Sequence, residues 1–134
     1  MEISARKVAS GCAAAMLLLA GCGDSSETAT VREVTTRFES AMVSHDSSTA
    51  CSLLAPEAVR RIDGLRPEGC VQALSSLKIP SAPPGDTQVW GDTAQVRTSA
   101  DTLFLRRFPG GWRIIGAGCT PRGEQPYECT VDGT

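Results

Sequence analysis

Residues 88–118 read QVWGDTAQVRTSADTLFLRRFPGGWRIIGAG, and this stretch decides the fold class. Apolar and polar side chains alternate along it with a period of two, which is typical of strands. Turn-forming residues interrupt the alternation at residues 91–92, 99–101 and 109–111. We therefore expect four strands that pair in chain order as an antiparallel meander within residues 86–118. Their expected bounds are 88–90, 93–98, 102–108 and 112–118.

Alternation also predicts which side chains face a hydrophobic core. Leu103 and Leu105 lie on one side of the third predicted strand, whereas Phe104 and Phe108 lie on the other. A strand that is apolar on both sides belongs near the middle of a sheet that is covered, at least partly, on both faces. The positions expected to point inward are all apolar: Val89, Ala94, Val96, Phe104 and Ile114.

The region before the strands has the periodicity of helices. Val31, Val34 and Phe38 recur on one stripe of the first predicted helix, and Thr30 and Glu33 have the spacing of a capping box at its start. Prolines then stop helix formation ahead of the first strand. This order predicts an α+β fold in which N-terminal helices pack on a curved antiparallel meander sheet. The expected helices are 30–44, 48–54, 56–64 and 67–77 within residues 30–78, and residues 79–85 connect them to the sheet.

The N-terminus has the pattern of an export signal. Arg6 and Lys7 precede an apolar run at residues 8–20, which ends in the sequence LAGC at residues 19–22. The run has the length of a signal peptide, whereas a membrane-spanning helix needs roughly 20 residues. The last four residues resemble the lipobox of bacterial lipoproteins, in which the cysteine becomes the acylated N-terminus of the mature chain.

This resemblance implies an organisation for the whole chain. Residues 1–21 are expected to be a lipoprotein signal peptide, and Cys22 the lipidated residue that holds the chain on the extracytoplasmic face of the cell membrane. Residues 22–29 are small, polar and acidic, so we expect a flexible tether there. Residues 30–134 are expected to form a single domain. The alternative for Cys22 is an ordinary cysteine that follows a secretory signal.

Four further cysteines follow the lipobox, and an even number in an exported domain indicates two disulfides. Three pairings are open, and we favour Cys51–Cys70 and Cys119–Cys129 because each pair is local in sequence. The second bridge would close residues 119–129 of the C-terminal tail (119–134) as a proline-bearing loop, and we expect a short edge strand in the last residues. The chain has no C-x-x-C motif and one histidine, so we expect no metal site and no other cofactor.

Several motifs of the expected domain resemble the small secreted lipoproteins of actinobacteria. They are F-x-x-A at residues 38–41, A-C-x-L-L-A-P at 50–56, C-x-x-A-L at 70–74, W-G-D-x-A-x-V at 90–96, D-T-L-F-L at 101–105 and A-G-C-T-P…P-Y-x-C at 117–129. These lipoproteins are similar to the NTF2-like (cystatin-like) superfamily, in which helices are wrapped by a bent sheet as a cone. The resemblance implies no catalytic residues. It implies a pocket, whose candidate lining residues are Trp90, Asp101, Phe104 and Trp112.

The net charge and the arrangement of possible catalytic residues limit the classes of function that this chain can have. The formal net charge of -2 provides no basic surface for nucleic acid. Ser44, His45 and Asp46 are adjacent and cannot converge as a triad. Asp101, the candidate general base, lies in a turn, where aspartate commonly bonds the backbone. We therefore favour a membrane-anchored extracytoplasmic module of the cell envelope that binds a small amphiphile or an envelope protein. The alternatives are a small cone-fold enzyme of the isomerase or hydratase type and a structural accessory of an envelope complex.

Overall fold

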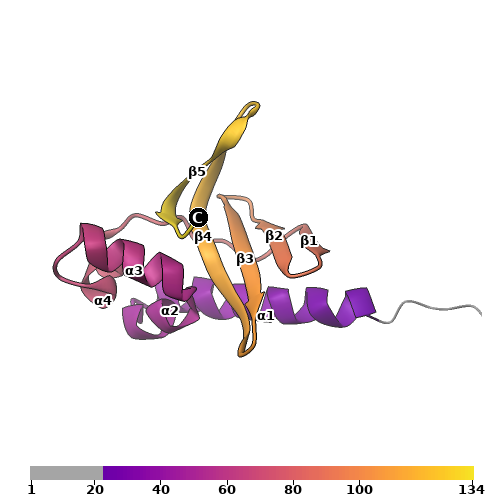
Figure 1. Cartoon of the computed structure of the whole chain (residues 1–134), viewed down its shortest axis with the longest axis horizontal. Helices are drawn as coiled ribbons and strands as arrows, with labels where there is room; N and C mark the ends of the chain where they lie inside the picture. The colour runs from indigo at the N-terminus through magenta and orange to yellow at the C-terminus, as the bar shows by residue number, and fades with distance from the viewer. Residues whose placement is uncertain (1–22) are drawn as a thin grey trace, which may run out of the picture.

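The computed structural model describes residues 23–134, so the expected signal peptide and Cys22 lie outside the described residues. Within that part of the chain, four helices come first and an antiparallel sheet of five strands follows (Figure 1). The strands pair in chain order, which confirms the α+β class and the predicted meander. None of the described helices is both long and apolar enough to span a bilayer. The elements are α1 (Gly23–Val43), α2 (Ser47–Leu53), α3 (Pro56–Leu65), α4 (Cys70–Ser76), β1 (Thr87–Trp90), β2 (Thr93–Arg97), β3 (Thr102–Phe108), β4 (Gly111–Arg122) and β5 (Gln125–Asp132).

The first helix, α1, begins at Gly23 and not at residue 30. The flexible tether predicted for residues 22–29 is therefore wrong from Gly23 onward. The predicted capping box is also wrong, because Thr30 lies inside α1, where its hydroxyl donates a hydrogen bond to the Ser26 carbonyl oxygen (3.0 Å). A contact with the sheet explains the early start. The carboxylate of Glu27, in the segment expected to be flexible, accepts hydrogen bonds from two side chains of β3 and β4.

The three short helices lie where they were predicted but differ at their ends. α3 begins at Pro56, as expected for a residue that lacks an amide donor and has a fixed φ. It continues to Leu65, one residue beyond its predicted end. α4 begins only at Cys70, because the preceding Gly69 has a φ of 81° and cannot be part of a helix.

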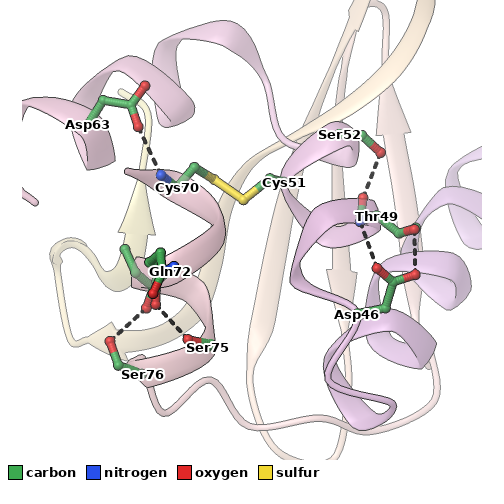
Figure 2. Close-up of a disulfide and its surroundings, with 10 residues drawn as sticks. Asp46, Thr49, Cys51, Ser52, Asp63, Cys70, Gln72, Ser75 and Ser76 are labelled. Carbon is green, nitrogen blue, oxygen red and sulfur yellow. Dashed lines mark hydrogen bonds between the residues drawn. A yellow bond between two sulfur atoms is a disulfide. The ribbon is translucent and has the colours of Figure 1, made fainter. Parts of the chain in front are cut away.

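A disulfide between Cys51 of α2 and Cys70 of α4 joins two of these helices, and its Cα atoms are 6.1 Å apart. Figure 2 shows the bridge between the two helices and the side chains around it. The Asp63 carboxylate, from α3, accepts a hydrogen bond from the Cys70 amide (2.9 Å; Figure 2). All three short helices are thus fastened together at Cys70, and the favoured pairing of these two cysteines is confirmed.

The hydrophobic core lies between the helices and one face of the sheet. Leu105 pairs with Ala94 on one side and Ile114 on the other, and all three side chains are buried. Val96 pairs with Leu103 in the same layer, and both are fully buried. The predicted inward positions Ala94, Val96 and Ile114 are therefore confirmed. Val89, predicted in the same set, is half-buried against this core. The helices cover the layer with the buried side chains of Phe38 and Leu74, and Leu54, which directly follows α2, joins them.

Phe104 is the predicted core position that the structure contradicts. Its side chain is half-buried and meets the ring of Tyr127 edge-on, with 5.1 Å between the ring centroids. Neighbouring residues of a strand point to opposite faces. Because Leu103 and Leu105 are fully buried under the helices, Phe104 must point to the outer face of the sheet.

Residues 119–129 are part of a hairpin and not the predicted loop, whereas the edge strand expected near the C-terminus is present as the end of β5. β4 continues through Cys119 to Arg122, and β5 returns antiparallel to it after a turn in which Gly123 has a φ of 64°. Cys119 and Cys129 stand directly opposite each other in this ladder and form the second favoured disulfide. In Figure 1 the hairpin extends beyond the rest of the sheet. Backbone pairing, which the two tail prolines made unexpected, is possible because Pro121 sits at a register shift and β5 is an edge strand.

Candidate functional site

The four residues predicted to line one pocket lie at three separate places. Trp90 and Phe104 line a groove of about 360 Å³ on the outer face of the sheet. We call it the outer groove. Trp90 ends the edge strand β1, and 54 % of its surface is exposed. Trp112 belongs to the opposite face, and Asp101 lies in the turn between β2 and β3. The predicted pocket is therefore wrong as a single site. The helix-facing side of the sheet, where a cone would have its cavity, is filled by buried side chains.

Trp112 serves as an anchor for the first helix. Its indole Nε1 donates a hydrogen bond to Oε2 of Glu27 (2.6 Å), and only 5 % of its surface is exposed. The Arg107 guanidinium donates to Oε1 of the same carboxylate (3.0 Å) and lies 5.9 Å from the centroid of the Trp112 ring. One carboxylate of α1 thus joins β3 and β4 to the helix, which is a structural role for Trp112.

Asp101 is buried, with 8 % of its surface exposed, but both of its carboxylate oxygens are occupied. Oδ1 accepts a hydrogen bond from the Thr98 hydroxyl (2.7 Å), and Oδ2 accepts one from the Gly118 amide (2.9 Å). These bonds hold the turn between β2 and β3 against β4. The expectation that Asp101 bonds the backbone near a turn is confirmed, and the observed role of its carboxylate is structural.

The other candidate groups also have structural partners or lie at the surface. His45 is exposed, follows the end of α1 and has a φ of 57°. Asp46 is the N-cap of α2, since its carboxylate accepts from the Thr49 amide (3.1 Å; Figure 2). Arg106 pairs with Glu57 of α3 at 3.5 Å. No cluster of three or more potential metal ligands occurs within residues 23–134.

The residue that sequence reasoning missed is Glu39, in the second half of α1. Its side chain is buried, with 6 % of its surface exposed. Oε2 accepts a hydrogen bond from the Ala82 amide (3.2 Å). Oε1 is buried and has no hydrogen-bond partner among the described residues. A carboxyl oxygen without a partner is costly to bury, so a natural protein that keeps one invites a functional explanation.

Burial raises the pKa of Glu39 to about 7, because the ionised carboxylate loses its hydration. The nearby charge of Asp101 raises this pKa further. The Ser81 hydroxyl, which lies close to the carboxylate, lowers it, and so does the Ala82 amide, which donates to Oε2. At neutral pH the carboxyl group is therefore close to half protonated, and it can act either as a donor or as an acceptor.

Glu39 lines a cleft of about 530 Å³ between α1 and residues 79–85, which we call the strap. The strap has neither helix nor strand, as its prolines predicted. Arg32 fastens its far end, because the guanidinium donates hydrogen bonds to the carbonyl oxygens of Pro84 (3.0 Å) and Gly85 and to the Thr87 hydroxyl (3.2 Å). We call this space the α1–strap cleft. Its lining residues are Arg32, Thr36, Glu39, Ser40, Val43 and residues 81–84.

Little in the sequence could have identified this cleft. Glu39 follows Phe38 at the border of the apolar stripe, and a glutamate there is typical of a solvated helix face. The strap lies 43 residues further along the chain, where the Ala82 amide meets Glu39. Only the tertiary packing of the strap against α1 buries the carboxyl group. Comparisons of the chain with protein-family models, curated proteins and solved structures found no match.

Proposed function

We propose that this chain is a lipid-anchored extracytoplasmic binding module that takes a small amphiphilic ligand in the α1–strap cleft. One observation carries the proposal: the Glu39 carboxyl group is buried beside the cleft with Oε1 unpartnered. A buried polar atom without a partner costs roughly 1–3 kcal/mol. A ligand that supplies the missing hydrogen bond would recover that free energy on binding. The cleft volume is also within the range of small-molecule sites.

The proposed location rests on a resemblance in the sequence and is supported by the disulfides. Residues 19–22 resemble a lipobox, so we propose that Cys22 carries the lipid and that the domain is at the extracytoplasmic face of the cell membrane. Two disulfides, Cys51–Cys70 and Cys119–Cys129, suit an oxidising compartment outside the cytosol.

The finer fold assignment is also part of this proposal. Helices followed by a five-stranded meander suit an NTF2-like relative among small actinobacterial lipoproteins. Only Leu54 and Ala55 separate α2 from α3, so no further element lies between these two helices. Since side chains fill the helix-facing side of the sheet, such a cone would take its ligand beside α1 and not inside.

Three alternatives rest on two observations, the pKa of Glu39 and the exposed ring of Trp90. A small cone-fold enzyme is supported by Glu39, because a pKa of about 7 suits a general acid or base at neutral pH. An envelope protein as partner is supported by Trp90, whose exposed ring borders the outer groove. A structural accessory of an envelope complex would use the same groove.

Native mass spectrometry of the full chain, extracted from the membranes of its own host, tests the proposal. We expect a small molecule bound to the wild-type chain and to Ser48→Trp, a control on the exposed side of α2. Ser40→Trp places a large ring in the α1–strap cleft and should abolish the adduct. A wild-type chain without a bound molecule, or an adduct that persists in Ser40→Trp, would contradict the proposal.

A further inference from the structure

We infer that the α1–strap cleft takes an uncharged ligand with a hydrogen-bond acceptor beside an apolar body, and that Oε1 of Glu39 is the donor to that acceptor. This inference rests on the proposed binding function and names the chemical class of the ligand. It depends on three features of the cleft, namely its walls, the fixed orientation of the carboxyl group and the charges nearby.

The walls of the cleft are largely apolar. Val43 lies at the C-terminal end of α1, and Ala82, Pro83 and Pro84 supply the facing wall from the strap. The Val43 side chain is 68 % exposed, so it has surface to lose when a ligand binds. An apolar ligand body would bury this surface at about 25 cal/mol per Å².

The orientation of the Glu39 carboxyl group is fixed by the strap. The Ala82 amide donates to Oε2, so that oxygen acts as an acceptor. When the group is protonated, its proton is therefore held on Oε1, which has no partner among the described residues. The O–H bond that results is a donor in the wall that Glu39 contributes to the cleft, and because Oε1 itself is buried, a ligand reaches it only by displacing the atoms that cover it. An amide, ketone or ester carbonyl oxygen on the ligand would accept from it.

The charged groups near the cleft offer an ionic ligand no free partner. Arg32 lines the cleft two helical turns before Glu39, but its guanidinium already donates hydrogen bonds to Pro84, Gly85 and Thr87. Asp101, which acts electrostatically on Glu39 from the β2–β3 turn, already accepts hydrogen bonds on both carboxylate oxygens. Burial of a charged group without a direct partner is costly. An uncharged ligand avoids that cost.

Three probes of matched shape test this inference: cyclohexanecarboxamide, cyclohexanecarboxylate and cyclohexylmethylammonium. Calorimetric titration uses the anchored chain in lipid nanodiscs, with empty nanodiscs as the blank. We expect the amide to bind most tightly of the three. Its affinity should fall about tenfold from pH 6 to pH 8, because the protonated fraction of a group with a pKa of about 7 falls by that factor.

Variants of α1 separate the role of Glu39 from other effects of pH. Glu39→Gln keeps a neutral donor, so amide binding should persist and lose its pH dependence. Glu39→Ala removes the donor and should weaken binding about tenfold at pH 6, which is the loss expected for one hydrogen bond. Glu33→Gln removes an exposed carboxylate from the same helix and should change nothing.

The titrations test the ligand class and the role of Glu39, whereas the proposed binding function is tested by the mass-spectrometry experiment. Tighter binding of the ammonium or carboxylate probe would overturn the uncharged class, although the cleft would still be a binding site. Unchanged pH dependence in Glu39→Gln would overturn the role of Glu39. Failure of the amide to bind at either pH would also overturn the inference, whereas the co-purified adduct decides the binding function independently.

Discussion

The indole Nε1 of Trp112 donates a hydrogen bond to Oε2 of Glu27 at 2.6 Å, although the two residues lie 85 positions apart in the chain. Trp112 is near the start of β4, and Glu27 is in the second turn of α1. This bond and the ion pair from Arg107 attach the first turns of α1 to the sheet. The attachment explains why a segment of small, polar residues is helical.

Replacement of Glu27 tests that attachment. Glu27→Ala should lower the free energy of unfolding by about 1–2 kcal/mol, because the buried Trp112 N–H loses its acceptor and Arg107 its partner. Glu27→Gln keeps an oxygen acceptor and should cost less. Urea unfolding followed by indole fluorescence measures both. Glu33→Ala, an exposed residue of the same helix, is the control. Equal stability of Glu27→Ala and Glu33→Ala would show that the contact contributes nothing.

Glu39 should make stability depend on pH. Its folded-state pKa of about 7 lies above the ordinary value of 4.5, so the folded chain binds more protons between these two values than the unfolded chain does. Stability therefore falls as pH rises through this window, by about 3 kcal/mol in all. Glu39→Gln should be more stable than wild type at pH 8 and equally stable at pH 4. Parallel stability curves for Glu39→Gln and wild type would contradict this.

Asp101 should act on stability through its two hydrogen bonds. Asp101→Asn places an amide N–H₂ group where one carboxylate oxygen accepts from Thr98 or Gly118, and we expect a loss of about 1–2 kcal/mol. Chemical denaturation measures the loss, and Asp86→Asn is an exposed control. A variant with full stability would mean that the turn between β2 and β3 does not need this carboxylate.

Loss of the Cys51–Cys70 bridge should cost about 3 kcal/mol, since its loop of 19 residues is constrained in the unfolded chain. A Cys51→Ala/Cys70→Ala double variant measured by thermal unfolding tests the value.

Peptide mapping without reductant should recover Cys51 linked to Cys70 and Cys119 linked to Cys129. A peptide that joins Cys51 to Cys119 would refute the pairing.

Membrane attachment should depend on Cys22. We expect Cys22→Ala to move the chain from the membrane fraction to the soluble extracytoplasmic fraction, because no acyl chain can be added to alanine. Cell fractionation with detection of the chain measures the shift, and Cys12→Ala, within the expected signal peptide, is the control. Persistent membrane association of Cys22→Ala would contradict the proposed anchor.

The sequence predicted the strands well because their signal is local. The alternation around Ala94, Leu105 and Ile114 correctly predicted three strands and the face that is buried. The turn residues at 109–111 correctly predicted the hairpin between β3 and β4. Helix ends were less predictable, since the start of α1 depends on Glu27 reaching Trp112 in a distant strand. The tail was predicted as a loop because its two prolines outweighed the pairing that the Cys119–Cys129 ladder provides.

The candidate site could not be predicted because, like the start of α1, it depends on contacts between residues that are distant in sequence. Trp90 and Phe104 are side chains of the kind that form pockets, yet the pleat directs them away from Trp112. Glu39 becomes unusual only when the strap, distant in sequence, covers it. Alternation within a strand can be read from neighbouring residues, whereas burial of one carboxyl group is a property of the assembled molecule.

Because α1 is helical from Gly23, the proposed lipid on Cys22 would adjoin a stiff rod with no slack between them. At 1.5 Å per residue, the carboxyl group of Glu39 would lie about 24 Å along the rod from its attachment point. The distance of the α1–strap cleft from the membrane surface would then change only when α1 tilts. A molecule that leaves the outer leaflet would therefore meet the cleft within a narrow range of distances from the headgroups.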